Sequence, residues 1–180
     1  MQIYNNFGDC KIILFIFVKI YLLMNITLLL VGKTEEEYLK EGITIFENRL
    51  KHYINFKSIV IPSLKNTKNI PVEEQKNKEA EEMLKHFTKS EYIVLLDEKG
   101  KEFRSADFAT FIQKQMNSGI KNLMFVVGGP FGFSNKIYEK ANMKLSLSQM
   151  TFSHQMIRLL FTEQLYRAFT ILKNEPYHNE

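Results

Sequence analysis

The chain has 180 residues, of which 45% are hydrophobic and 24% charged, and this suffices for one globular domain with a sizeable core. A formal net charge of +4 is a mild excess, so charge alone neither establishes nor excludes a polyanionic partner such as RNA. The single cysteine, Cys10, excludes an intramolecular disulfide and a metal site built from cysteines, and it favours a reducing, cytoplasmic location. The four histidines, at positions 52, 86, 154 and 178, lack the spacing typical of metal ligands.

Residues 1–23 differ in character from the rest of the chain. Their longest apolar run, residues 12–18, is far shorter than the roughly 18 residues that a membrane-spanning helix needs, and Lys19 interrupts it. No small-residue cleavage site follows, as a secretory signal peptide would require. We interpret residues 1–23 as an upstream-translated or non-native extension and Met24 as the start of the domain. An extra strand and a weak membrane anchor are the alternatives.

From Asn25 onward, strand-like and helix-like periodicities alternate, which predicts an α/β fold with a mainly parallel sheet and helices on both faces. The predicted strands are residues 26–31, 56–61, 92–97, 123–127 and 145–147. The predicted helices are residues 35–53, 72–87, 105–116, 135–142 and 155–172. Ligands of such sheets bind outside the carboxyl ends of the strands, so Asp97, Gly128 and the segment after Leu147 are expected to meet in one crevice.

Three residues carry signals for the first turn of a helix. Thr34 and Ser105 are hydroxyl residues directly before helical patterns and are predicted to act as N-caps. Pro71 is well placed to start the helix that follows it, since its fixed φ suits that position.

The most informative segment is residues 123–133, where an apolar strand runs into a loop with glycines at 128, 129 and 132. Glycine lets the backbone approach a ligand closely, so this loop is a candidate binding site. It lacks the Gly-x-Gly-x-x-Gly spacing of dinucleotide-binding loops. The Gly-Lys-Thr at residues 32–34 is not a P-loop either, because Thr27 stands where that motif requires glycine.

Apolar residues surround nearly the whole circumference of the last predicted helix, which indicates burial on more than one side, against the sheet and against a second subunit. Its polar residues include Arg158 and the i, i+4 pair Glu163 and Arg167. An interface ion pair and an active-site role are both open for these charges. His154, just before the helix, is either a structural hydrogen-bonding residue or a catalyst.

Several C-terminal motifs occur in one order: Gly-Gly-Pro-x-Gly at 128–132, Leu-Ser-Leu-Ser at 145–148, Ser-His at 153–154, Arg-Leu-Leu at 158–160, Glu-Gln-Leu-Tyr-Arg-Ala at 163–168 and Pro-Tyr-His at 176–178. With them, residues 24–180 closely resemble the ribosomal RNA large-subunit methyltransferase H family of the SPOUT class. The resemblance implies a single SPOUT domain with an α/β knot, in which a C-terminal trefoil knot shapes a pocket for S-adenosylmethionine. It further implies a cytoplasmic homodimer that methylates N3 of a pseudouridine in the helix 69 loop of 23S rRNA, on the assembled ribosome and without a metal or a membrane.

The same resemblance implies roles for individual residues. The expected cofactor-binding residues are Leu96, Gly128, Leu147, Ser148, Gln149, Met150, Thr151 and Phe152. For catalysis, His154 is the candidate base or orienting donor, with Tyr177 and His178 closing over the nucleobase and Arg158 or Arg167 contacting phosphate. S-adenosylhomocysteine would be the product. Asn179 replaces the basic residue that often follows the terminal Tyr-His in the family, so an RNA contact at that position is not expected.

Three rival functions follow from the same residues. A SPOUT methyltransferase acting on another RNA would keep the fold and the cofactor but change the target. A non-catalytic ribosome-binding factor would keep the fold and lose the cofactor. A protein anchored to a membrane through residues 12–23 is the third alternative.

Overall fold

The computed structural model describes residues 24–65, 67–89 and 91–178 of the chain. The predictions for residues 1–23 lie outside this part. Within it, no helix is both long and apolar enough to cross a membrane.

The centre of the fold is a five-stranded sheet in the order β2-β1-β4-β3-β5, in which every neighbouring pair is parallel. The strands are β1 (Asn25–Val31), β2 (Asn55–Ile61), β3 (Glu91–Glu102), β4 (Asn122–Val127) and β5 (Met143–Ser146). The inner strands β1 and β4 are almost completely buried. Their near-continuous apolar sequences are those of strands covered on both faces.

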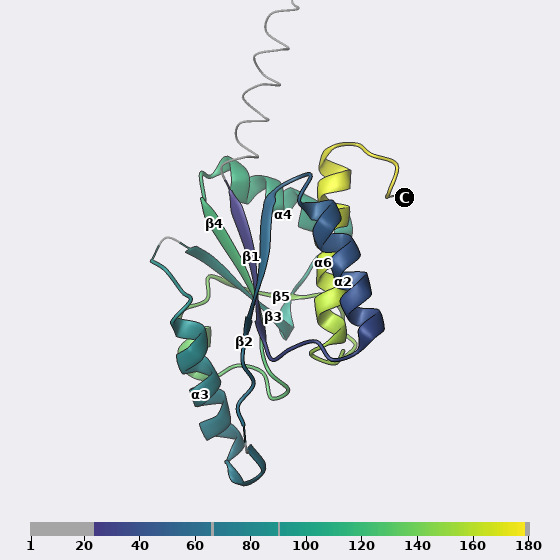
Figure 1. The fold of residues 1–180 in the computed structure, drawn as a ribbon. Helices are drawn as coiled ribbons and strands as arrows, with labels where there is room; N and C mark the ends of the chain where they lie inside the picture. The colour runs from purple at the N-terminus through teal and green to yellow at the C-terminus, as the bar shows by residue number, and fades with distance from the viewer. Residues whose placement is uncertain (1–23, 66, 90, 179–180) are drawn as a thin grey trace, which may run out of the picture.

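Helices cover the sheet on both faces, as Figure 1 shows. One face carries α2 (Glu37–Leu50), α4 (Ser105–Asn117) and α6 (Met156–Leu172); the other carries α3 (Val72–Leu84) and the short α5 (Asn135–Tyr138), with a 3-10 turn at Thr67–Asn69 before α3. Each layer encloses its own hydrophobic core. The predicted α/β architecture with helices on both faces is therefore confirmed.

Helix α6 packs between α2 and α4, with its inner face on the sheet. Phe161 illustrates this burial: it is inaccessible to solvent, and its ring centroid lies 4.6 Å from that of Phe125 in β4. Within one chain, α6 is thus buried on more than one side, as its apolar circumference predicts.

Thr34 and Ser105 do not act as the predicted N-caps. Helix α2 begins two residues later than expected, after Glu36, and the hydroxyl of Thr34 instead accepts a hydrogen bond of 3.0 Å from Arg158. Ser105 is the first residue of α4 rather than its N-cap, and its hydroxyl donates to Gln164 of α6. In both cases a tertiary contact outcompetes the local cap. Pro71 does precede the first residue of α3, as predicted.

Strand β3 is longer than its apolar run predicts, because it continues through the polar residues 98–102. Leu96 and Lys101 both pair with Leu145 of β5, so the register shifts between them. Gly100 permits this crossing, since a Cβ there would lie 2.5 Å from the Leu145 backbone. Helix α5 ends at Tyr138 rather than at residue 142, and β5 correspondingly starts at Met143.

Candidate active site

A cavity of about 750 Å³ lies at the carboxyl ends of β3, β4 and β5. Three chain segments form most of it: residues 96–99 in β3, residues 127–133 from the last residue of β4 onward, and residues 145–154 from the last two residues of β5 onward. All of these residues except Gln149 line the cavity. Asp97, Gly128 and the segment after Leu147 therefore meet in one crevice, as the parallel-sheet argument predicts.

The loop after β4 forms one wall of the cavity. Its residues 129–132 make a tight turn in which the Gly132 amide donates to the Gly129 carbonyl at 3.1 Å, and Gly132 has a φ of +75°. That left-handed conformation favours glycine, which explains the third glycine of the loop. The turn leaves Phe131 49% exposed beside the cavity.

The loop after β5 forms the opposite wall and is stabilised largely by its own serines. Ser146 donates from its hydroxyl to the Ser148 carbonyl at 2.8 Å, and the Ser148 hydroxyl accepts from the Met150 amide at 2.9 Å. Such side-chain contacts replace the ladder hydrogen bonds that end with β5. Thr151 links the loop to β3 by donating to Glu98 at 3.3 Å.

Most of the residues expected to bind the cofactor line this cavity. Those that do are Leu96, Gly128, Leu147, Ser148, Met150, Thr151 and Phe152. Gln149 does not; its side-chain amide donates to Glu102 of β3 at 3.3 Å. Within residues 147–152, Gln149 alone does not line the cavity and contacts the sheet edge instead.

The cavity also has polar residues that sequence reasoning missed. Lys76 reaches it from α3, which no motif indicated. Tyr138 of α5 lines it as well and donates from its hydroxyl to Asp97. Burial, followed by the hydrogen bond and charge of Asp97, raises the pKa of Tyr138 above its ordinary value, so the phenol stays protonated.

His154 lies at the edge of the cavity, between the loop after β5 and α6, and is partly buried. Burial lowers the pKa of its imidazole, the positive charge of Arg158 lowers it further, and Glu35 opposes both. The neutral imidazole is therefore favoured near neutral pH, the form that is able to accept a proton.

Arg158 does not line the cavity but lies directly beneath His154, fully buried. Its guanidinium donates to the carbonyl oxygens of Val31 at 2.6 Å, Gly32 at 2.8 Å and His154 at 3.0 Å, besides the Thr34 hydroxyl. These contacts tie the carboxyl end of β1 to the first turn of α6.

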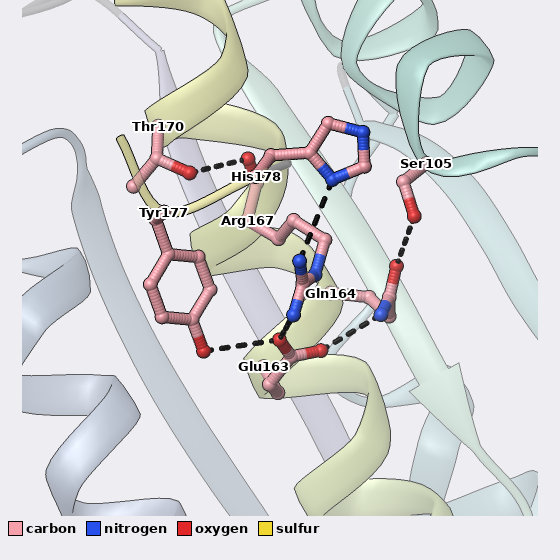
Figure 2. A network of polar contacts seen from close by, with 7 residues as sticks. All are labelled: Ser105, Glu163, Gln164, Arg167, Thr170, Tyr177 and His178. Carbon is pink, nitrogen blue, oxygen red and sulfur yellow. Dashed lines mark hydrogen bonds and ion pairs between the residues drawn. The ribbon is translucent and has the colours of Figure 1, made fainter. Parts of the chain in front are cut away.

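The C-terminal tail lies on α6, and neither Tyr177 nor His178 lines the cavity of the same chain. Figure 2 shows a polar network in which Glu163 accepts from Tyr177 at 3.1 Å and from Arg167 at 2.6 Å, while the His178 ring contacts Arg167 at 3.4 Å. Tyr177 also packs edge-on against Tyr166 at 4.8 Å between centroids. The predicted i, i+4 pair of Glu163 and Arg167 is confirmed, and it anchors the tail.

Comparison with known proteins identifies the class to which this fold and cavity belong. A family profile described as "Predicted SPOUT methyltransferase" matches residues 24–178. The chain therefore belongs to the SPOUT methyltransferase family, and it is a methyltransferase.

Its curated relatives have a more specific name. The chain is 56% identical over 156 residues to the ribosomal RNA large subunit methyltransferase H of Christiangramia forsetii, covering 87% of this chain and 99% of the relative. It is 56% identical over 157 residues to the protein of the same name from Parabacteroides distasonis, covering 87% of this chain and 100% of the relative.

The crystal structure of a probable methyltransferase from Bordetella pertussis Tohama I has the same fold. Its TM-score is 0.50 with 11% identity, and the match covers 84% of this chain and 97% of that one.

Proposed function

We propose that this protein transfers the methyl group of S-adenosylmethionine to N3 of a pseudouridine in the helix 69 loop of 23S rRNA, on the assembled ribosome in the cytoplasm. The observation that carries the proposal is the cavity at the carboxyl ends of β3, β4 and β5, which is lined by seven of the eight residues expected to bind the cofactor: Leu96, Gly128, Leu147, Ser148, Met150, Thr151 and Phe152. The rRNA target rests on relatives that align over almost their whole length.

The residues of the cavity fit S-adenosylmethionine. A volume of about 750 Å³ is in the range of small-molecule sites. Leu96, Leu147 and Phe152 supply apolar surface for the adenine, and the glycine backbone at residues 128–129 offers polar groups without a side chain in the way. When bound, the cofactor supplies a methyl group on a positively charged sulfur. The carboxylate of Asp97 in the same cavity suits that charge.

We assign proton acceptance to His154. When N3 takes the methyl group, the carbon–sulfur bond to that methyl breaks and S-adenosylhomocysteine is left. The N3–H proton must leave the pseudouridine, and the neutral imidazole at the cavity edge is available to accept it. Positioning the nucleobase in line with the methyl group accounts for much of the expected acceleration. His154 thus acts as the general base in this proposal.

Of the two arginines proposed to contact RNA phosphate, Arg167 is better placed. Its side chain is 25% exposed. Arg158, by contrast, is fully buried, and its guanidinium donates hydrogen bonds to backbone carbonyl oxygens of the same chain. We propose that Arg158 supports catalysis by fixing the turn that carries His154. For Tyr177 and His178 to close over the nucleobase of this cavity, the tail must leave Glu163.

Two further features belong to the proposal. The fold of the family implies that the C-terminal segment passes through a loop of the chain to form a trefoil knot. The family also implies a homodimer, for which the exposed side chains of Phe131 and Met150 beside the cavity offer apolar surface. Analytical ultracentrifugation of the purified protein tests the dimer.

The activity is tested by incubating the protein with S-adenosylmethionine and ribosomes that lack the modification. Mass spectrometry of the digested rRNA should locate one new methyl group, on N3 of a helix 69 pseudouridine. A methyl group elsewhere would favour a different RNA target. Absence of both methylation and cofactor binding by calorimetry would favour a non-catalytic ribosome-binding factor.

A further inference from the structure

Helix α3 buries two polar residues where the rest of its inner face is apolar. Its buried residues are Gln75, Glu79, Ala80 and Met83. Ala80 and Met83 belong to the hydrophobic core over the sheet. Glu79 is only 5% exposed, although carboxylates are rarely buried without a role.

The Glu79 carboxylate lies directly behind the glycine wall of the cavity, which we define as Gly128 and Gly129. A Cβ at position 129 would lie 2.6 Å from Glu79 Oε2 and 2.9 Å from Oε1, closer than a carbon atom tolerates. Gly129 itself lines the cavity, whereas Glu79 does not. A single residue without a side chain, Gly129, therefore lies between the carboxylate and the cavity.

No cationic side chain neutralises this carboxylate among the described residues. The ion pairs of α3 involve Glu73, Glu74 and Glu82 on its outer surface. Glu79 has a hydrogen bond to Gln75, which lowers its pKa, but burial is the larger effect and raises it. The carboxylate is thus held in a position where its negative charge is costly unless a positive charge comes near.

We propose that Glu79 is a specificity-determining residue that favours the cationic methyl donor over its neutral-sulfur product, acting through the glycine wall. This inference rests on the proposed function. S-adenosylmethionine and S-adenosylhomocysteine differ by one methyl group and one positive charge at sulfur. A buried negative charge behind the wall attracts the first more than the second, so methyl transfer itself weakens binding and promotes product release.

Calorimetric titration with both ligands tests the proposal. In wild-type protein and in Glu79→Gln, the dissociation constants of S-adenosylmethionine and S-adenosylhomocysteine are measured at the same pH. We expect Glu79→Gln to raise the dissociation constant of S-adenosylmethionine by about tenfold and to change that of S-adenosylhomocysteine little. Glu79→Asp, which keeps the charge, should retain most of the preference. Glu81→Gln, on the exposed side of α3, changes the net charge equally and serves as the matched control.

The outcomes separate the two proposals. Equal changes for both ligands in Glu79→Gln, or no change, would overturn the role of Glu79 while leaving the function intact. The role of Glu79 would also be overturned if Glu81→Gln lost the preference for S-adenosylmethionine over S-adenosylhomocysteine to the same extent. The preference would then depend on net charge and not on the position of Glu79. If the wild-type protein bound neither ligand, the proposed function itself would fail.

Discussion

Arg158 and Val31, 127 positions apart in the chain, are joined by a hydrogen bond of 2.6 Å from the guanidinium to the carbonyl oxygen. The same side chain satisfies the carbonyls of Gly32 and His154, so one buried cation fixes the end of β1 relative to the turn beneath the cavity. An arginine performs this task because its planar group presents several donors in fixed directions.

We expect Arg158→Lys to lower the free energy of unfolding by about 2 kcal/mol or more, since lysine cannot reach all of these acceptors and leaves buried carbonyls unsatisfied. Urea denaturation measures the change. Arg104→Lys, at an exposed position, is the control and should change stability by less than about 0.5 kcal/mol. Equal stability of Arg158→Lys and wild type would contradict the assigned bracing role.

His154→Ala should abolish methyl transfer and leave the affinity for S-adenosylmethionine nearly unchanged, because the imidazole is assigned to the nucleobase proton. Single-turnover methylation and calorimetry measure the two properties separately. Unchanged turnover would remove His154 from the mechanism.

The wild-type rate should also depend on pH in a defined direction. The pKa of His154 lies below its ordinary value of 6.5, because burial and Arg158 outweigh Glu35. The imidazole therefore stays neutral until the pH falls below 6.5, and the acid limb of the single-turnover rate should lie there. An acid limb centred above pH 6.5 would show that another group titrates.

Glu79→Gln should make the free protein more stable than wild type at pH 7.5. The folded-state pKa of Glu79 is raised above its ordinary value of 4.5, so between pH 4.5 and that raised pKa the folded protein holds a proton that the unfolded chain releases. Wild-type stability is consequently lost as the pH rises from 4.5 through the raised pKa. Thermal denaturation should show a difference at pH 7.5 that disappears near pH 4. A wild type more stable than Glu79→Gln at pH 7.5 would refute this.

Glu163→Gln should release the tail from α6. The carboxylate accepts from Arg167 and Tyr177, and hydrogen bonds to charged groups contribute about 1.5–3 kcal/mol each. We expect faster amide exchange at Glu175, Tyr177 and His178, while Tyr177→Phe, which keeps the ring contact with Tyr166, should have a smaller effect. If exchange were the same in Glu163→Gln and wild type, the network would not be what holds the tail.

Hydrophobic periodicity predicted the strands and helices well because the sheet is buried on both faces, as in β4. It failed where tertiary contacts decide local structure. Thr34 looked like a helix cap but accepts from Arg158 of α6, a partner more than a hundred positions away. The polar half of β3 gave no strand signal, since its pairing with β5 depends on the approach of two backbones at Gly100.

The parts of the site that are contiguous in sequence were predicted, and the parts that come from a distant helix were not. The segment from Leu147 to Phe152 was predicted from the family resemblance, and all of it except Gln149 lines the cavity. Lys76 and Glu79 were not found, because a helix with many charged residues offers no sign of which ones turn inward. Only the packing of α3 on the Gly129 loop distinguishes Glu79 from its neighbours.

The register shift between β3 and β5 has a consequence for ligand binding in the cavity. Because β3 pairs with β5 both before and after the shift between Leu96 and Lys101, β5 is fixed against β3 by backbone hydrogen bonds up to the point where the loop after β5 begins. The serine contacts then set the loop itself. The site is in this sense preorganised, because little chain entropy is lost when a ligand binds. The contacts between the cavity and the ligand therefore yield a higher affinity than the same contacts would in a flexible loop.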